Sequence, residues 1–176
     1  MAGPVFLDGD DVQLRTIEEE GLSFLQAGVN DPQVWRAIGR PHPVNGQQER
    51  EFFDEVASSD DSVDLLVTVD GDRAGIVSLW LDDGHSQNAE LGYWIDPDHH
   101  RQGYASEAAD LLTTYGFRQL ALHRIEARVF EGNDASQNLW ETLGFDHEAV
   151  HREAIYLHGE YRDVHRYAVL ENEWES

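Results

Sequence analysis

Apolar and polar residues alternate along several short stretches of the chain, as they do in half-buried strands whose side chains point to two faces in turn. Leu91, Tyr93 and Ile95 share one face of the stretch 89–95, and the residues between them share the other. Asp96-Pro97 ends this strand, because the residue before a proline disfavours continued regular structure. The same alternation predicts strands over residues 12–16, 63–69, 74–81, 123–130, 149–156 and 161–170.

A helical period begins directly after the strand at 89–95. Tyr104, Ala108 and Leu112 recur at helical spacing, which predicts a long helix as far as Arg118 with Thr113 on its solvent side. Further helices are predicted over residues 18–28, 32–38, 47–57 and 134–143. The last has a start that resembles a capping box, with Asp134 and Gln137, and we expect Ala135, Leu139 and Leu143 to face inward.

This order of strands, interior helices and a closing hairpin predicts an α/β fold with a mixed sheet of about seven strands. A chain of 176 residues can bury a proper core, and we expect one domain over residues 1–176. No stretch approaches the roughly eighteen consecutive apolar residues of a membrane span, and the start of the chain does not resemble a signal peptide. We therefore expect a soluble, cytoplasmic protein. The absence of cysteine excludes disulfides and a cysteine nucleophile.

The charge balance is strongly acidic. There are 35 Asp and Glu residues against 12 basic residues, all of them Arg, and the net charge is −23. The acidic residues are spread along the whole chain, so the charge is a property of the surface rather than of one tail. In about 1 M salt the screening length falls to roughly 3 Å, which removes repulsion that destabilises such a surface. We expect a halophilic protein, and the lack of a basic surface argues against nucleic-acid binding.

The junction between the strand at 89–95 and the long helix has the form of an anion-binding turn. Unpaired backbone N–H groups at a helix start, together with the helix dipole, favour negative charge. Gly103 lies at the junction, and without a Cβ it lets a ligand approach the main chain closely. A phosphate group is the expected ligand.

The segment HHRQGYASEA resembles the pyrophosphate loop of the GNAT N-acetyltransferase superfamily. Gly103 and Ala105 match the family pattern, whereas His100 stands where the family has Arg or Gln. A second match, NDASQNLWETLGF over 133–145, is similar to the Rim-type branch, which acetylates protein N-termini, and the similarity extends from about Val12 to Leu170. With the acidic composition, the resemblance suggests a haloarchaeal member. It implies a mostly antiparallel sheet, splayed to admit acetyl-CoA.

The resemblance also implies which residues bind acetyl-CoA. Backbone N–H groups of Trp94 or Ile95 would meet the thioester carbonyl, and Gly92 would let the pantetheine arm approach the strand. Asn133 matches a residue that binds that arm in the family, although an Asn after Gly132 also suits a left-handed turn. The implied binding residues are Trp94, Ile95, His100, Arg101, Gln102, Gly103, Tyr104, Ala105, Ser106, Asn133 and Asn138.

Catalysis needs a neutral amine, so a group must accept the proton of the acceptor. Glu90 occupies the position where many GNAT enzymes carry a base; the alternative is a polar residue on an exposed strand face. The family's usual tyrosine acid is replaced by Trp140, which cannot act as an acid. Ser136 is the best candidate to assist the leaving thiolate, and a polar residue in the first turn of the helix is the alternative.

The loop after the strand also contains Asp96, Asp98, His99 and His100. A metal site is not expected there, because closed sites usually draw their ligands from separate elements. Arg101 is better explained as a positive charge near the phosphates. Glu107 lies in the first turn of the helix, and we expect its side chain to point away from bound phosphates.

These observations favour an N-acetyltransferase that transfers the acetyl group of acetyl-CoA to a primary amine without a metal. By resemblance to the Rim-type branch the acceptor is a protein N-terminus, while a small amine such as a polyamine, amino sugar or amino acid is the alternative. A non-catalytic acyl-CoA-binding module remains the alternative of another class. We expect no membrane partner, and a monomer or a homodimer.

Overall fold

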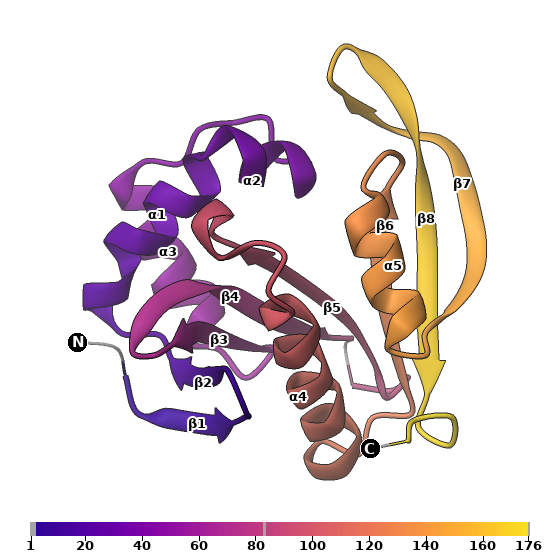
Figure 1. The fold of residues 1–176 in the computed structure, drawn as a ribbon, viewed down its shortest axis with the longest axis horizontal. Coiled ribbons are helices and arrows are strands. Elements are labelled where there is room, and N and C mark those ends of the chain that lie inside the picture. Colours follow the sequence, from indigo (N-terminus) through magenta and orange to yellow (C-terminus); the bar gives the residue numbers. More distant parts are fainter. Residues whose placement is uncertain (1–2, 83, 176) are drawn as a thin grey trace.

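The computed structural model describes residues 3–82 and 84–175, and within them eight strands form one sheet (Figure 1). The strand order is β1-β2-β3-β4-β5-β6-β8-β7. The strands are β1 Val5–Asp8, β2 Gln13–Thr16, β3 Ser62–Val69, β4 Asp72–Leu81, β5 Asn88–Ile95, β6 Arg124–Phe130, β7 Asp146–Leu157 and β8 Glu160–Leu170. The prediction of an α/β fold with a mixed sheet is confirmed. The count of seven missed β1, a four-residue strand whose side chains are mostly exposed and show no alternation.

Five α-helices accompany the sheet in the described part of the chain: α1 Leu22–Asn30, α2 Pro32–Ala37, α3 Gly46–Phe52, α4 Tyr104–Gln119 and α5 Asp134–Thr142. Glu18 to Glu20 precede α1 instead of opening it, because a 3-10 turn over Glu19–Gly21 comes first. The helix expected to reach residue 57 ends earlier and continues as a π turn over Phe53–Ala57. None of these helices combines the length and apolar character needed to cross a membrane.

The sheet is divided by its one parallel pair of neighbouring strands. β5 pairs with β6 only at Asn88–Arg124, Ala89–Ile125 and Glu90–Glu126, whereas every other neighbouring pair described here is antiparallel. Beyond Glu90 the two strands separate, as Figure 1 shows between β5 and the β6–β8–β7 part. The expected splay is therefore present, and the edge of β5 from Leu91 to Ile95 has no strand beside it.

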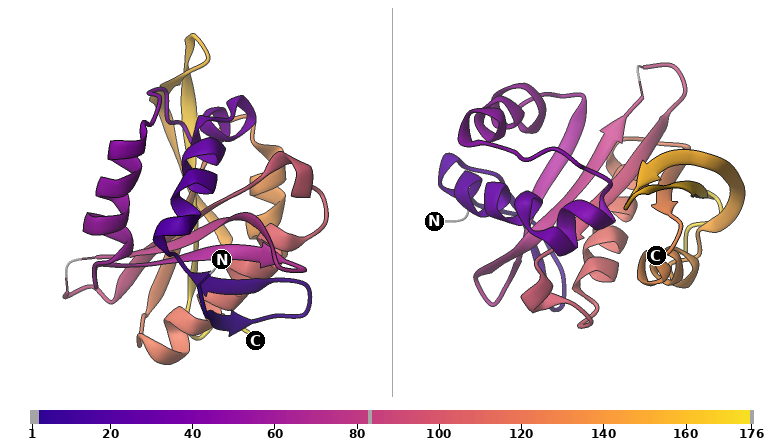
Figure 2. Two further views of the ribbon diagram at one scale, coloured as in Figure 1. Left: turned by 90° about the vertical axis from the view of Figure 1, so that its left-hand side faces the viewer. Right: turned by 90° about the horizontal axis from the view of Figure 1, so that it is seen from above.

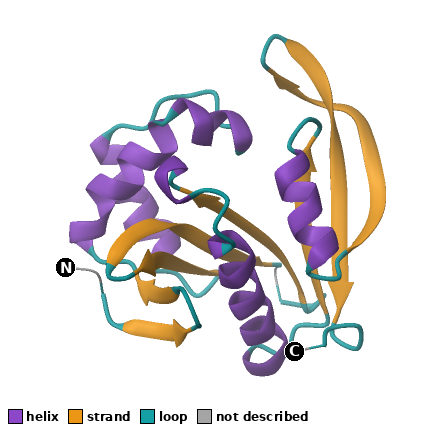
Figure 3. Cartoon of the chain, viewed as in Figure 1, coloured by secondary structure: helices purple, strands orange, loops and turns teal. Residues whose placement is uncertain are grey.

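Helices cover both faces of the sheet (Figure 3). On one face, α4 and α5 pack on the larger core, which contains Leu91, Ile95 and Leu112. On the other face, α1 and α2 pack on a smaller core around Trp94, with Leu25 and Val34. The two faces of β5 predicted from alternation are thus confirmed, because odd-numbered residues reach one core and Trp94 reaches the other.

Three local predictions about helices are wrong. Thr113 is buried instead of solvent-facing, because α4 lies deep enough to bury two neighbouring rows of side chains. The inward face of α5 carries Ser136 and Trp140, while Ala135 is exposed. The N-cap of α5 is Asn133, whose side chain accepts a hydrogen bond from the Ser136 N–H at 3.2 Å, so Asp134 is already the first helical residue.

Two hairpins turn where the sequence indicates. Asp70 and Gly71 have φ values of 51° and 87°, and His158 and Gly159 have 56° and 87°. Two consecutive left-handed residues are what a two-residue hairpin turn requires. The second hairpin, β7–β8, projects away from the rest of the molecule (Figure 2).

Candidate active site

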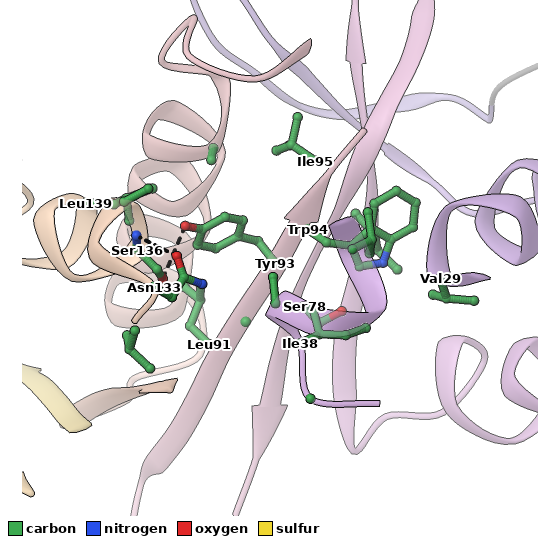
Figure 4. Close-up of a pocket in the computed structure, with 18 of the residues that line it drawn as sticks. Val29, Ile38, Ser78, Leu91, Tyr93, Trp94, Ile95, Asn133, Ser136 and Leu139 are labelled. Carbon is green, nitrogen blue, oxygen red and sulfur yellow. Dashed lines mark hydrogen bonds between the residues drawn. The ribbon is translucent and has the colours of Figure 1, made fainter. Parts of the chain in front are cut away.

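A cavity of about 1050 Å³ opens at the separation of β5 and β6. Leu25 and Val29 of α1 line it from one face of the sheet, and Asn133 and Ser136 from α5 and its cap line it from the other. Figure 4 shows Tyr93 turned toward α5 and Trp94 turned the opposite way. The cavity therefore reaches both faces of the sheet through the gap beside β5.

The loop before α4 has the geometry of an anion cradle. Gly103 is the N-cap of α4 with φ 84°, no side chain caps the helix there, and an added Cβ would meet nothing within 4 Å. Arg101 also has a left-handed φ of 61°. The first N–H groups of a 16-residue helix are thus open to a ligand, which fits a pyrophosphate-bearing donor. The predicted residues His100, Arg101, Gln102, Gly103, Tyr104, Ala105 and Ser106 all line the cavity.

One polar residue of this loop and one acidic residue in the first turn of α4 contact other parts of the protein. His100 Nε2 lies 2.7 Å from the carbonyl oxygen of Ile95, so the residue that departs from the family pattern braces the loop against the end of β5. The Glu107 carboxylate accepts hydrogen bonds from the N–H groups of Asp11 at 3.0 Å and Val12 at 3.4 Å. The expectation that Glu107 points away from the phosphate loop is confirmed.

The backbone of β5 offers donors to the gap at alternate residues. Asp96 N–H donates to the Ala74 carbonyl at 2.8 Å, and Asp82 N–H donates to the Asn88 carbonyl at 3.0 Å, so even-numbered residues of this strand face β4. The N–H of Trp94 is therefore committed to the ladder. Of the two predicted backbone donors, Ile95 has its N–H on the open edge, together with Tyr93.

Gly92 lines the cavity and also makes room for a side chain of the neighbouring strand. A Cβ at this position would lie 2.7 Å from the Trp80 ring, so the missing side chain makes room for that indole on the face of the sheet that carries Trp94. Trp80 is 40% exposed and lines the cavity. Gly28 makes room for the Trp94 ring in the same way, because a Cβ at Gly28 would lie 2.2 Å from that ring.

Tyr93 and Ser136 meet across the cavity. The Tyr93 hydroxyl donates to Ser136 Oγ at 3.3 Å, and the Asn133 side chain caps the same turn (Figure 4). Burial raises the pKa of Tyr93, an effect that the Ser136 hydrogen bond only partly offsets. The sequence analysis missed Tyr93, although a phenol on the apolar face of β5 was a visible signal. Asn133 has φ −95°, so Gly132 takes the left-handed position instead.

Trp140 is part of the core. It is 1% exposed and packs on Phe145 and Tyr93, with ring centroids 4.8 and 5.8 Å apart. Its Nε1 is buried and has no hydrogen-bond partner within the described chain. Asn138, the remaining predicted binding residue, is exposed on α5 and lines the cavity.

Glu90 lies on β5 at the cavity wall between two arginines. Its Oε1 pairs with Arg128 Nε at 2.8 Å, and its Oε2 lies 3.5 Å from Arg166 Nη1. The chain of ion pairs continues from Arg166 through Glu126, Arg124 and Glu148. Hydrogen bonding to Glu148 raises the pKa of Arg124, and the same contact lowers the pKa of Glu148. Sequence periodicity gave no sign of this cross-strand network.

Glu49 of α3 is a second carboxylate in the cavity wall, and the sequence analysis missed it. It stands three and four residues before Phe52 and Phe53, so a charge occupies the apolar stripe of the helix.

The acidic residues and histidines of the loop after β5 do not assemble a metal site. Asp96 caps the turn at Pro97–His99, and among residues 3–82 and 84–175 no group of three His, Cys, Asp or Glu could hold a metal.

Comparison with known proteins agrees with this geometry. The family model described as an acetyltransferase (GNAT) domain matches residues 11–146. YdaF of Bacillus subtilis, which is named as a ribosomal N-acetyltransferase, is 35% identical over 107 residues, covering 61% of this chain and 58% of YdaF. The spermidine N(1)-acetyltransferase of Escherichia coli is 25% identical over 163 residues, covering 93% and 88%.

Solved structures share the fold. The spermidine N-acetyltransferase of Vibrio cholerae, solved with CoA and spermine, superposes with a TM-score of 0.87 at 23% identity and covers 94% of this chain and 98% of its own. Because the family model spans more than half of the sequence, the chain belongs to the GNAT acetyltransferase family, whose members use acetyl-CoA as the acyl donor.

Proposed function

We propose that the protein acetylates the N-terminal amine of another protein. The observation that carries the proposal is that the open edge of β5, the phosphate cradle before α4 and the α5 cap border one cavity that reaches both faces of the sheet. Acetyl-CoA bound on the face of the sheet that carries α4 and α5 would leave the opening of the cavity on the other face free for an acceptor. The name of YdaF supports a protein acceptor.

The donor would be held by main-chain groups at one end and by side chains at the other. The N–H groups at the start of α4 and the side chains of Arg101 and Ser106 bind the phosphates, where the dipole of α4 adds favourable charge. Asn133 and Asn138 contact the pantetheine arm beside the open edge of β5. The Ile95 N–H meets the carbonyl oxygen of the thioester, which becomes more negative as the amine attacks.

Three side chains, Glu90, Tyr93 and Ser136, accept the proton of the amine or stabilise the charge on the leaving sulfur. Glu90 takes the proton of the acceptor ammonium through a water molecule, because guanidinium groups already contact both of its oxygens. The neutral amine forms the new carbon–nitrogen bond, and the carbon–sulfur bond breaks with its electron pair moving to sulfur. The second proton of the amine passes through water to the leaving thiolate. Tyr93 and Ser136 donate hydrogen bonds to that sulfur, and burial keeps the phenol protonated by raising its pKa.

Tyr93→Phe should lower kcat roughly 10- to 100-fold while the Kd for acetyl-CoA changes little, because one hydrogen bond to a charged sulfur is lost. Tyr167→Phe is the matched control. The Tyr167 hydroxyl donates a hydrogen bond at 3.2 Å to Glu141 of α5, the helix that also carries Ser136, but Tyr167 does not line the cavity. Stopped-flow rates and calorimetric binding measure the two quantities. Equal kcat values for the two variants would remove Tyr93 from the mechanism.

The function is tested by following CoA release with a panel of peptides and small amines at matched salt. We expect turnover with unblocked peptides and none with the same peptides carrying a formylated N-terminus. A small cationic amine is the second candidate acceptor, favoured by the buried carboxylate of Glu49 and by the spermidine enzyme among the relatives. Turnover with spermidine but with none of the peptides would identify a small cationic amine as the acceptor.

The acidic surface supports a further proposal, that the protein works in high salt, as a haloarchaeal protein does. The net charge of −23 repels itself in dilute buffer, and molar salt screens this repulsion. We expect the melting temperature to rise steadily as KCl increases to molar concentration. A melting temperature that is independent of KCl would contradict this, and non-ionic sucrose at matched osmolality is the control.

A further inference from the structure

Glu49 is buried in the wall of the cavity. Only 5% of the residue is exposed, although its helix has just begun at Gly46 after the Asn45 cap. It lies on the side of α3 that carries Phe52 and Phe53 toward the smaller core. A carboxylate on an apolar helix face costs free energy unless a partner compensates it.

The protein supplies no such partner. Within the described chain, no donor lies within hydrogen-bond distance of the Glu49 carboxylate and no cation lies within ion-pair distance. Burial raises the pKa of Glu49, and the more distant charge of Arg40 only partly opposes this. Asp64, the other buried carboxylate of this face, is different, because the hydroxyls of Ser62 and Ser78 both donate to it.

We propose that Glu49 binds a second cationic group of the acceptor, an ammonium or guanidinium that is separate from the amine that becomes acetylated. A cation would supply both the charge and the donors that the carboxylate lacks. The attacked amine has to reach the open edge of β5, which begins next to Glu90, whereas Glu49 belongs to a helix on another wall of the same cavity. The proposal rests on the proposed acetyl transfer and specifies its acceptor.

Two sources could provide this group, a Lys or Arg side chain near the N-terminus of a peptide or the distal amine of a small diamine. The test uses matched pairs of acceptors: peptides with Lys or norleucine at the second position, and 1,4-diaminobutane or butylamine. For the wild type we expect a lower KM for the charged member of at least one pair. Glu49→Gln should raise that KM roughly 10- to 100-fold, with KM for the uncharged member and for acetyl-CoA unchanged.

Asp64→Asn is the matched control, because it neutralises a buried carboxylate that does not line the cavity. The pair that responds identifies the source of the cation. Equal effects of Glu49→Gln on charged and uncharged acceptors, or no effect on either, would overturn the proposal while acetyl transfer stands. If no amine supports CoA release by the wild type, the proposed function fails instead, and with it this inference.

Thermal unfolding checks that the Glu49→Gln variant is folded. The pKa of Glu49 is raised above its ordinary value of 4.5 in the folded state, so the folded state binds the proton more tightly than the unfolded state, and Glu49 destabilises the protein as pH rises above 4.5. Glu49→Gln should therefore melt at a higher temperature than the wild type near pH 7, and the difference should vanish below pH 4.5. A lower melting temperature at pH 7 would make Glu49 a structural residue and overturn the proposal.

Discussion

Glu90→Gln should lower kcat by roughly 10²- to 10⁴-fold, or about 3 to 5 kcal/mol of barrier, with little change in acetyl-CoA affinity. The substitution keeps the size of the side chain but removes its capacity to accept a proton, and the amide nitrogen cannot accept a hydrogen bond from the second arginine. The rate of the variant should recover as pH rises, because a larger fraction of the acceptor amine is then neutral without help. Steady-state rates from pH 6 to 10 measure both effects.

Glu126→Gln is the matched control for this experiment. Glu126 lies one strand away, pairs with Arg166 and Arg124 in the same chain of ion pairs, and does not line the cavity. If it lowers kcat as much as Glu90→Gln does, the carboxylates act by holding the arginines in place. Full activity of Glu90→Gln at neutral pH would return Glu90 to a polar position on an open strand face.

Gly103→Val should raise the Kd for acetyl-CoA roughly 10- to 100-fold, because it disturbs one or two hydrogen bonds to charged phosphate oxygens. Valine is strained at φ 84°, and its side chain would project into space that the protein leaves open. The fold should persist, since nothing in the described structure lies within 4 Å of the added Cβ. Isothermal calorimetry measures the affinity.

Gly159→Val is the control that measures the effect of backbone strain alone. Gly159 has φ 87°, also has no neighbour within 4 Å of an added Cβ, and lies in the β7–β8 turn away from the cavity. Both variants should lose similar stability in urea unfolding, and only Gly103→Val should bind acetyl-CoA weakly. An unchanged Kd for Gly103→Val would contradict the assignment of the phosphate loop.

The features that could be predicted from the sequence are those set by local periodicity and by turn chemistry. Alternation placed Leu91 and Ile95 on one core and Trp94 on the other, and two hairpin turns followed from their glycines. The left-handed turn before α4 could be located because a strand, Gly103 and a helix follow each other directly in the chain. Such features depend on residues that are close together in the chain, so one sequence is enough to predict them.

The features that could not be predicted depend on pairing between distant segments. Arg166 reaches Glu90 across 76 positions of sequence, and Trp80 covers Gly92 from a neighbouring strand. The alternation rule assigns a face to a side chain but does not name its partner on the next strand. Ser136 and Trp140 are buried on the inner face of α5 whereas Ala135 is exposed, because the strands against which the helix packs decide which of its residues are buried.

The three-residue contact between β5 and β6 also bears on the cooperativity of the molecule. The β6–β8–β7 part joins the remaining sheet through a short seam, and a sheet normally gains its unity from long runs of cross-strand hydrogen bonds. The larger core already joins the two parts of the sheet, and a donor bound along that seam would add contacts to both sides. Through binding to the folded protein only, such a donor at a hundredfold excess over Kd would stabilise it against unfolding by about 2.7 kcal/mol.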